Sequence, residues 1–157
     1  MGKPIFTVTE LHEDIQIWGL CKQSNDKTQS KDIPTISKKY YEITEKKDGE
    51  VIPFFVLSQG YDVQTKDFLL FVGGLIVEKN LDTFTIPKGL YVKSTVRPKL
   101  NLLWGLSIGE AKRAFYMEWL PKSNYDELNM EYEYHTSKAK SKNPEIDILF
   151  AIKRKAD

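Results

Sequence analysis

Three consecutive stretches decide the fold: SIGEAKRAFYMEWLP at 107–121, NMEYEYH at 129–135 and EIDILFAIK at 145–153. The first predicts an amphipathic helix, because its apolar residues recur at helical spacing, namely Ile108, Ala111, Phe115 and Trp119. Ser107 and Glu110 have the spacing of a capping box, and Pro121 ends the pattern. The other two stretches alternate or are rich in β-branched residues, as strands are. The predicted order is therefore one helix and then two strands.

A strand also precedes this helix, because GLYVKST at 89–95 follows the turn signal Pro87-Lys88-Gly89. The same order occurs earlier in the chain. A strand is predicted at 14–21, and a helix follows with Asp32 as its N-cap and with apolar residues at Ile33, Ile36, Tyr40 and Ile43. Strands at 52–59 and 68–77 flank a hairpin loop at 60–66.

The two halves keep a nearly constant offset of 75 to 77 residues. Their first strands begin at residues 14 and 89, 75 apart, and their second strands begin at 52 and 129, 77 apart. We therefore predict an α+β fold with a duplicated βαββ motif: two antiparallel half-sheets, each with a helix, form a barrel-like, pseudo-two-fold domain with a central cleft. One domain is expected over 1–157, with pseudo-repeats at about 6–80 and 84–154 and short accessory strands at 6–11 and 84–86. Such a cleft is a common place for a ligand.

The composition excludes several classes of function. The net charge of +1 gives no general attraction to nucleic acid. Cys21 is the single cysteine, so the chain can form neither an internal disulfide nor a thiolate metal cluster. The longest apolar run, at 68–77, is too short to span a bilayer and the N-terminus lacks a signal peptide, so we expect a cytoplasmic protein without membrane contact. His12 and His135 do not have metal-ligand spacing, and we expect neither a metal nor a cofactor.

The segment EWLPKSNY at 118–125 is the most specific motif, because it is similar to "eWlp-x-S-x-Y" of a known family. Other stretches carry the same resemblance: Ile17–Leu20 (IWGL), Leu69–Gly73 (LLFVG), Ile86–Tyr91 (IPKGLY), Tyr132–His135 (YEYH) and the closing strand at 146–153. The chain resembles the gyrase-inhibitor-like (GyrI-like) small-molecule-binding domains, which also occur as effector-binding domains of AraC-type bacterial regulators. His135 stands where the family usually has a tyrosine.

The resemblance implies a stand-alone ligand-binding module, with a separate DNA-binding regulator as a candidate partner, and it places Glu133 inside the cleft. Glu131, Glu133 and His135 share one face of a predicted strand, and the other face, with Met130, Tyr132 and Tyr134, suits packing against a helix. The offset of 77 makes Glu133 equivalent to Val56. Burial is expected to raise the pKa of such a carboxylate, and a cationic ligand would pair with it.

Aromatic side chains are candidates to line the cleft: Trp18, Phe55, Tyr91, Trp104 and Trp119. Trp104 lies in an apolar stretch at 100–106 that is predicted to be a loop. Trp119 and Tyr91 are also explained by core packing, and Glu131 and Glu133 by a solvated sheet face paired with lysines. The lysines at 137–143 fit an exposed hairpin tip.

Three functions remain open at this level. The first is non-catalytic binding of a small amphipathic, apolar or cationic molecule. The second, implied by the resemblance, is hydrolysis of reactive electrophiles by Glu133 with Tyr91. The third is inhibition of a topoisomerase through the apolar stretch around Trp104.

Overall fold

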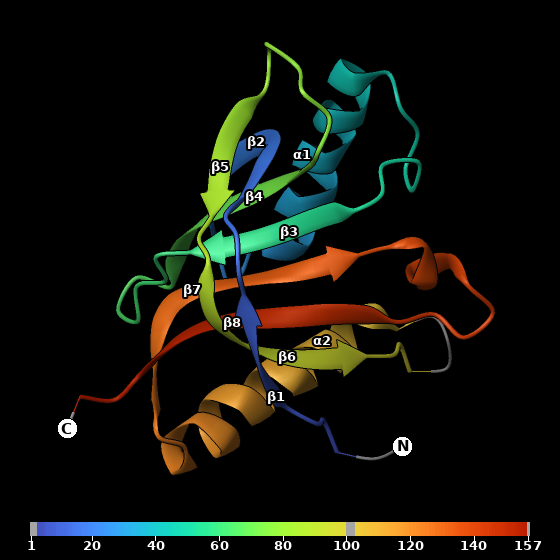
Figure 1. Cartoon of the computed structure of the whole chain (residues 1–157). Coiled ribbons are helices and arrows are strands. Elements are labelled where there is room, and N and C mark those ends of the chain that lie inside the picture. Colours follow the sequence, from blue (N-terminus) through green and yellow to red (C-terminus); the bar gives the residue numbers. More distant parts are fainter. Residues whose placement is uncertain (1–2, 100–102, 157) are drawn as a thin grey trace.

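The protein forms one antiparallel sheet of eight strands with two helices (Figure 1). The computed structural model describes residues 3–99 and 103–156. The strands are β1 (Thr7–Leu11), β2 (Ile15–Asn25), β3 (Phe54–Gln59), β4 (Asp67–Gly74), β5 (Asp82–Ile86), β6 (Gly89–Val96), β7 (Tyr125–His135) and β8 (Ile146–Arg154). The helices are α1 (Gln29–Thr44) and α2 (Trp104–Ala114), and α2 continues through a π-helical turn (Phe115–Trp119) and a 3-10 turn (Leu120–Lys122).

The strand order, β1-β6-β8-β7-β3-β4-β2-β5, has the same pattern when it is followed from either end. The two half-sheets expected from the sequence are the two halves of this continuous sheet, and the pairing of β3 with β7 joins them. Val56 lies directly opposite Glu133 in that pairing. These two residues are 77 positions apart, so the pseudo-two-fold axis passes between them. Each short accessory strand pairs with the other half, because β1 pairs with β6 and β5 with β2.

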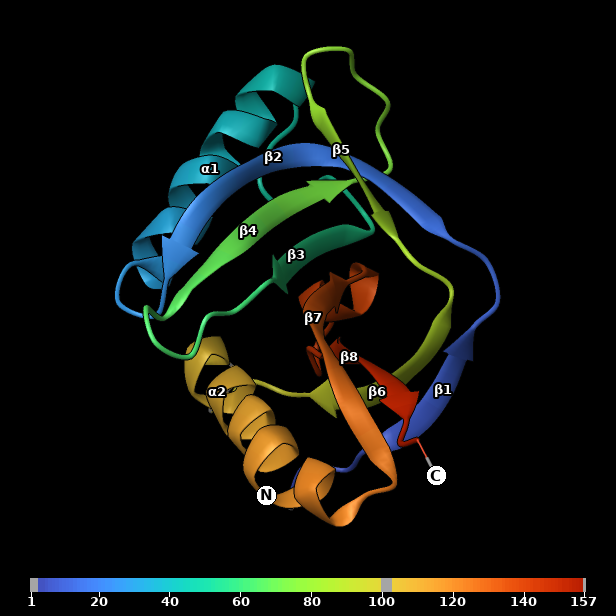
Figure 2. The ribbon, with the colours of Figure 1, turned by 90° about the vertical axis from the view of Figure 1, so that its left-hand side faces the viewer.

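Both helices cover the same face of the sheet, and β1 and β5 lie on the opposite side of the molecule (Figure 2). Under α1, a buried cluster contains Ile36, Tyr40, Val51, Val56, Phe68, Leu70, Val72 and Leu81. Under α2, a second cluster contains Val92, Val96, Ala111, Phe115, Ile146, Ile148, Phe150 and Ile152. The sheet curls into a half-barrel, and its inner face holds a third cluster, which includes Ile17, Phe55, Leu57, Tyr91 and Tyr132.

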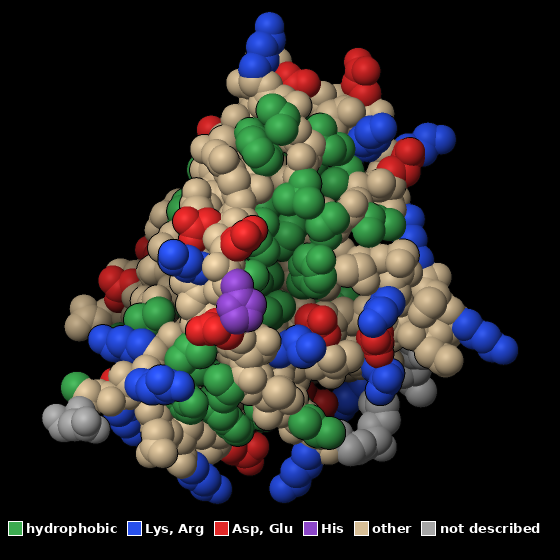
Figure 3. All heavy atoms as spheres, in the orientation of Figure 1, with side chains coloured by type: hydrophobic (Ala, Val, Ile, Leu, Met, Phe, Trp, Pro, Cys, Tyr) green, Lys and Arg blue, Asp and Glu red, His purple; other side chains and the backbone are tan. Residues whose placement is uncertain are grey.

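The face opposite the helices carries a band of hydrophobic side chains over β3 and β7 (Figure 3). Several partly buried residues pack against the inner cluster, namely Leu11, Ile15, Phe84, Tyr134 and Leu149. The open side of the half-barrel is therefore lined by partly exposed hydrophobic side chains (Figure 3).

The beginning of α1 differs from the prediction. The helix starts at Gln29, after Thr28, so Asp32 is not its N-cap but lies within the first turn. The Asp32 carboxylate instead accepts hydrogen bonds from Lys22 Nζ, Ser24 Oγ and Thr28 Oγ1, each 2.8 Å long. Two of these donors belong to β2, so a tertiary contact replaced the expected local cap.

The predicted capping box of α2 is also wrong. The helix begins at Trp104, so Ser107 and Glu110 lie inside it. Ser107 Oγ accepts a hydrogen bond from the backbone N–H of Lys99, and Glu110 pairs with the Lys99 ammonium at 2.6 Å. The apolar stretch predicted as a loop at 100–106 is partly helical, since Trp104 to Leu106 form the first turn, while 100–102 lie outside the described residues.

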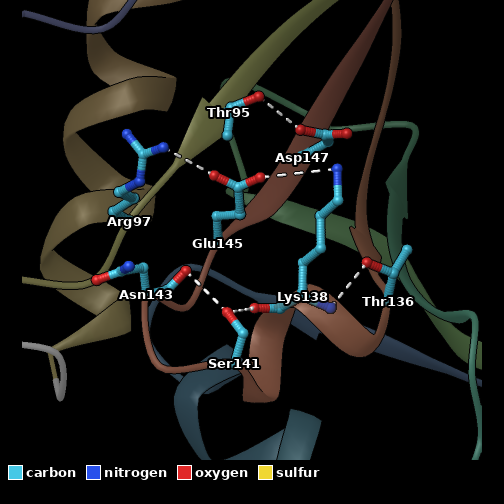
Figure 4. Close-up of polar contacts among 8 residues, drawn as sticks. All are labelled: Thr95, Arg97, Thr136, Lys138, Ser141, Asn143, Glu145 and Asp147. Carbon is cyan, nitrogen blue, oxygen red and sulfur yellow. Dashed lines mark hydrogen bonds and ion pairs between the residues drawn. The ribbon is translucent and has the colours of Figure 1, made fainter.

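The hairpin between β7 and β8 is exposed, as expected from its lysines, and polar contacts hold its base (Figure 4). Glu145 accepts a hydrogen bond from Arg97 at 2.9 Å and lies 3.9 Å from the ammonium of Lys138. Thr95 donates to Asp147 at 2.7 Å.

Among the described residues, no helix is long and apolar enough to cross a bilayer.

Candidate functional site

A group of charged and polar side chains lies where β7 meets α2. We call it the polar seam, and it consists of Glu131, Glu133 and His135 of β7 with Lys112 of α2 and Tyr116 of the π-helical turn that follows α2. The Lys112 ammonium lies 3.1 Å from Glu131 Oε2, and the Tyr116 hydroxyl donates to Glu131 Oε1 at 3.1 Å. Glu133 Oε1 lies 3.0 Å from His135 Nε2. Two carboxylates are thus held by three different partners.

The backbone explains this grouping. Glu131, Glu133 and His135 are two residues apart on a strand, so their side chains share one face. Lys112 and Tyr116 are four residues apart on the helix, so they also share a face. The π-helical turn begins at Phe115, directly after α2, and π-helical turns are often found at functional sites.

The face assignment made from the sequence is wrong. The helices cover the face with Glu131 and Glu133, while Met130, Tyr132 and Tyr134 point into the inner cluster of the half-barrel. Glu133 stands between Val56 on β3 and Ile148 on β8, which belong to the clusters under α1 and α2, respectively. It therefore lies where the two helix-covered cores meet, and only 9% of the residue is exposed.

The pKa of Glu133 departs from its ordinary value in the direction opposite to the prediction. Burial is the largest influence and by itself would raise the pKa, but the hydrogen bond from His135 and the positive charge of Lys112 together outweigh it. The pKa of Glu133 is consequently lowered, and the residue is ionised at neutral pH.

Lys112 and Tyr116 of the seam keep their protons at neutral pH. Burial tends to lower the pKa of Lys112, yet the charges of Glu131 and Glu133 raise it overall, so the ammonium stays charged. Burial and the adjacent Glu131 raise the pKa of Tyr116, which stays a hydrogen-bond donor. Burial also raises the pKa of nearby Glu127, and the negative charge of Glu131 adds to this shift. One ammonium thus lies beside two carboxylate side chains.

Trp18 and His135 lie in one cross-strand row. Trp18 pairs with Gly74, Gly74 with Phe54, and Phe54 with His135. The rings of Phe54 and His135 meet edge to face with centroids 6.4 Å apart, and Tyr41 stacks on Phe54 at 5.6 Å. An aromatic group under α1 therefore borders the polar seam.

Phe55 and Tyr91 belong to the opposite face. Both are buried in the inner cluster with Tyr132, and the Tyr91 hydroxyl donates to the Pro87 carbonyl at 2.5 Å. Burial raises the pKa of Tyr91 to about 12. The structure thus separates these two residues from Glu133 by the thickness of the sheet.

Trp104 and Trp119 pack against the cluster under α2. Trp119 stacks between Phe115, at 5.6 Å, and Tyr125, at 6.0 Å. The core packing predicted for Trp119 is confirmed, and Trp104, at the first position of α2, is partly buried on the same cluster.

Two cavities lie away from the seam. One of about 1330 Å³ runs between α2, β6 and the N-terminal segment, and one of about 330 Å³ lies beside Tyr125; neither is lined by Glu131 or Glu133. Within residues 3–99 and 103–156, there is no group of three or more His, Cys, Asp or Glu side chains that could hold a metal ion.

Sequence reasoning missed Lys112 and Tyr116. The sequence marks them only as polar residues that directly follow the apolar positions Ala111 and Phe115 of the amphipathic helix. Helical spacing alone does not show that their side chains reach Glu131 on β7. Sequence reasoning also gave the buried residue Asp32 the wrong role, because the sequence predicted an N-cap there.

Searches against family models and curated proteins found no match. Solved structures do match. SAV2435 bound to tetraphenylphosphonium has a TM-score of 0.68 and 10% identity, covering 95% of this chain and 94% of that one. The EcmrR C-terminal domain has a TM-score of 0.62 and 15% identity, covering 97% and 99%. A hydrolase from Listeria innocua has a TM-score of 0.52 and 11% identity, covering 96% and 93%.

These likenesses, all below 25% identity, establish the fold and agree with the resemblance found in the sequence. The chain has the GyrI-like fold.

Proposed function

We propose that this protein binds a small lipophilic cation at the polar seam without transforming it. The observation that carries the proposal is a pair of carboxylates in a half-buried place: Glu131 and Glu133 are both largely enclosed, and Lys112 is the one lysine or arginine among the described residues that pairs with either of them. A buried charge without full compensation is costly, so a cation that reaches this position is strongly favoured.

Aromatic rings beside the seam support the same class of ligand. Phe54 with Tyr41 lies on the α1 side, and Tyr116 packs edge-on to Phe150 at 5.6 Å on the α2 side. Aromatic faces attract cations and offer apolar contact area. SAV2435, which has the same fold, was solved with tetraphenylphosphonium, a cation covered by four phenyl groups.

A hydrolytic role receives less support. The sequence paired Glu133 with Tyr91 for that role, but the two lie on opposite faces of the sheet. A carboxylate whose pKa is lowered is also a weak general base at neutral pH. Glu133 and Tyr91 therefore do not form a catalytic pair that would extend the likeness to a protein named a hydrolase into a shared activity.

We further infer a regulatory role, in which the bound cation acts as a signal to a separate DNA-binding partner. The support is the likeness to the EcmrR C-terminal domain and to EcmrR in a complex with DNA. In that complex the match covers 58% of the EcmrR chain.

The test is the replacement Glu133→Gln, with tetraphenylphosphonium and neutral triphenylphosphine oxide as ligands in calorimetric titrations. The substitution removes the charge and keeps the shape, so we expect roughly tenfold weaker binding of the cation and little change for the neutral compound. Equal losses for both compounds, or no loss for either, would contradict the proposal.

A matched control is Glu10→Gln. Glu10 also lies two residues before a histidine, His12, and 3.3 Å from its ring, but both side chains are more than half exposed on the surface. This variant should bind both compounds as the wild type does.

A further inference from the structure

Lys112 occupies the position that a ligand cation needs. Its ammonium lies 3.1 Å from Glu131, and its positive charge also acts on Glu133. Among the described residues, it is the one lysine or arginine that pairs with either carboxylate. A ligand cation that pairs with Glu131 therefore has to take the place beside this carboxylate that the Lys112 ammonium occupies.

We propose that Lys112 is a tethered competitor, which occupies the anionic site from within the chain and leaves it when a cationic ligand binds. This inference rests on the proposed function and adds the way in which the site is regulated. Lys112 lies on α2, one turn before Tyr116, so the helix that borders the seam also carries the competing charge.

The side chain has a path out of the seam. About 27% of the Lys112 side chain is exposed, so a rotation of its four-carbon stem returns the ammonium to water. Glu131 would still hold the Tyr116 hydroxyl at its other oxygen, and Glu133 would still hold His135. Displacement of Lys112 therefore costs one ion pair and leaves the remaining contacts of the seam in place.

This arrangement selects among cations. A small hydrated cation would exchange its own water shell for a site that Lys112 already neutralises in part, and it offers no apolar surface in return. A lipophilic cation buries aromatic or aliphatic area next to Phe54 and Tyr116 when it replaces the ammonium. A ligand cation must therefore bind strongly enough to displace the Lys112 ammonium, and only cations with substantial apolar area do so.

The first experiment replaces Lys112 with methionine, which keeps the unbranched stem and removes the charge. We expect Lys112→Met to bind tetraphenylphosphonium about tenfold more tightly than the wild type, and triphenylphosphine oxide within about twofold. The control Arg113→Met removes one positive charge from the exposed side of the same helix and should change neither affinity beyond about twofold.

The outcomes are distinct. If the wild type binds tetraphenylphosphonium and Lys112→Met binds it equally or more weakly, the competitor role is wrong while the proposed function stands. If Arg113→Met strengthens binding as much as Lys112→Met, a general charge effect replaces the specific one, and the inference again fails. If neither the wild type nor Lys112→Met binds the cation, both the inference and the proposed function fail.

A second measurement uses the wild-type protein, so it does not depend on the folding of a variant. Amine acetylation is followed residue by residue by mass spectrometry, with and without saturating tetraphenylphosphonium. Displacement should raise the rate at Lys112 severalfold and leave exposed Lys38 on α1 unchanged. A rate at Lys112 that stays constant or falls would show that the ammonium remains in the seam, and would overturn the inference.

Discussion

Two glycines of the sheet allow β2 and β4 to approach closely, and replacing one of them should have a large effect on stability. Gly19 and Gly73 are directly paired across these strands. A methyl group added at Gly73 would lie 2.8 Å from the Gly19 Cα and closer still to the Trp18 carbonyl oxygen. The contact with the Trp18 oxygen, at 2.1 Å, is 1.3 Å shorter than the 3.4 Å at which ordinary contact begins, so the backbones must separate by roughly that amount.

A separation of that size stretches the neighbouring ladder hydrogen bonds beyond their normal range. Two such bonds contribute about 1–3 kcal/mol, and lost packing on the inner face adds to this. We therefore expect Gly73→Ala to lower the free energy of unfolding by about 3 kcal/mol, which corresponds to a decrease of roughly 6–12 °C in Tm for a chain of this size. Urea unfolding followed by circular dichroism, with the m-value checked for two-state behaviour, measures the change.

Gly109→Ala is the matched control, because a Cβ at this position of α2 meets nothing within 4 Å. Alanine is the better helix former, so this variant should gain about 0.8 kcal/mol. If Gly73→Ala unfolds at the wild-type urea concentration, or shifts in the same direction as Gly109→Ala, the reasoning from close backbone approach is refuted.

Two further predictions concern contacts that anchor the loops. The three donors to Asp32, led by Lys22, lower its pKa to about 2 from 3.8, so its stabilising contribution is present above pH 3.8 and is lost as the pH falls through about 2. The difference in urea midpoint between wild type and Asp32→Asn should thus be constant from pH 7 to 5 and shrink between pH 4 and 2; a difference independent of pH would contradict this. Asn129, at φ 54°, accepts from the Tyr61 N–H at 2.9 Å and donates to the Tyr61 carbonyl at 3.0 Å. Asn129→Ala should cost about 1–3 kcal/mol and speed amide exchange at Gly60 and Tyr61, while unchanged exchange there would argue against this clamp.

Part of the site was predictable because it depends on local geometry. Alternation along a strand placed Glu131, Glu133 and His135 on one face, and helical spacing placed Trp119 in the core. The ends of the helices were mispredicted, because Ser24 and Lys22 on β2 bind Asp32, and Lys99 binds Ser107 and Glu110, in place of the expected caps. Such competition between local and distant partners is not visible in a spacing pattern.

The sequence by itself determined the two-half α+β architecture and its nearly constant offset, since hydrophobic periodicity fixes the type and order of the elements. It also determined which β7 residues share a face of the strand. Only the tertiary structure decided which face of the sheet the helices cover, and therefore that Lys112 and Tyr116 reach Glu131 while Tyr91 and Phe55 do not. The physical reason is that a period of two residues defines two faces without saying which is covered, and the pKa of Glu133 depends on charges that the fold brings from another element.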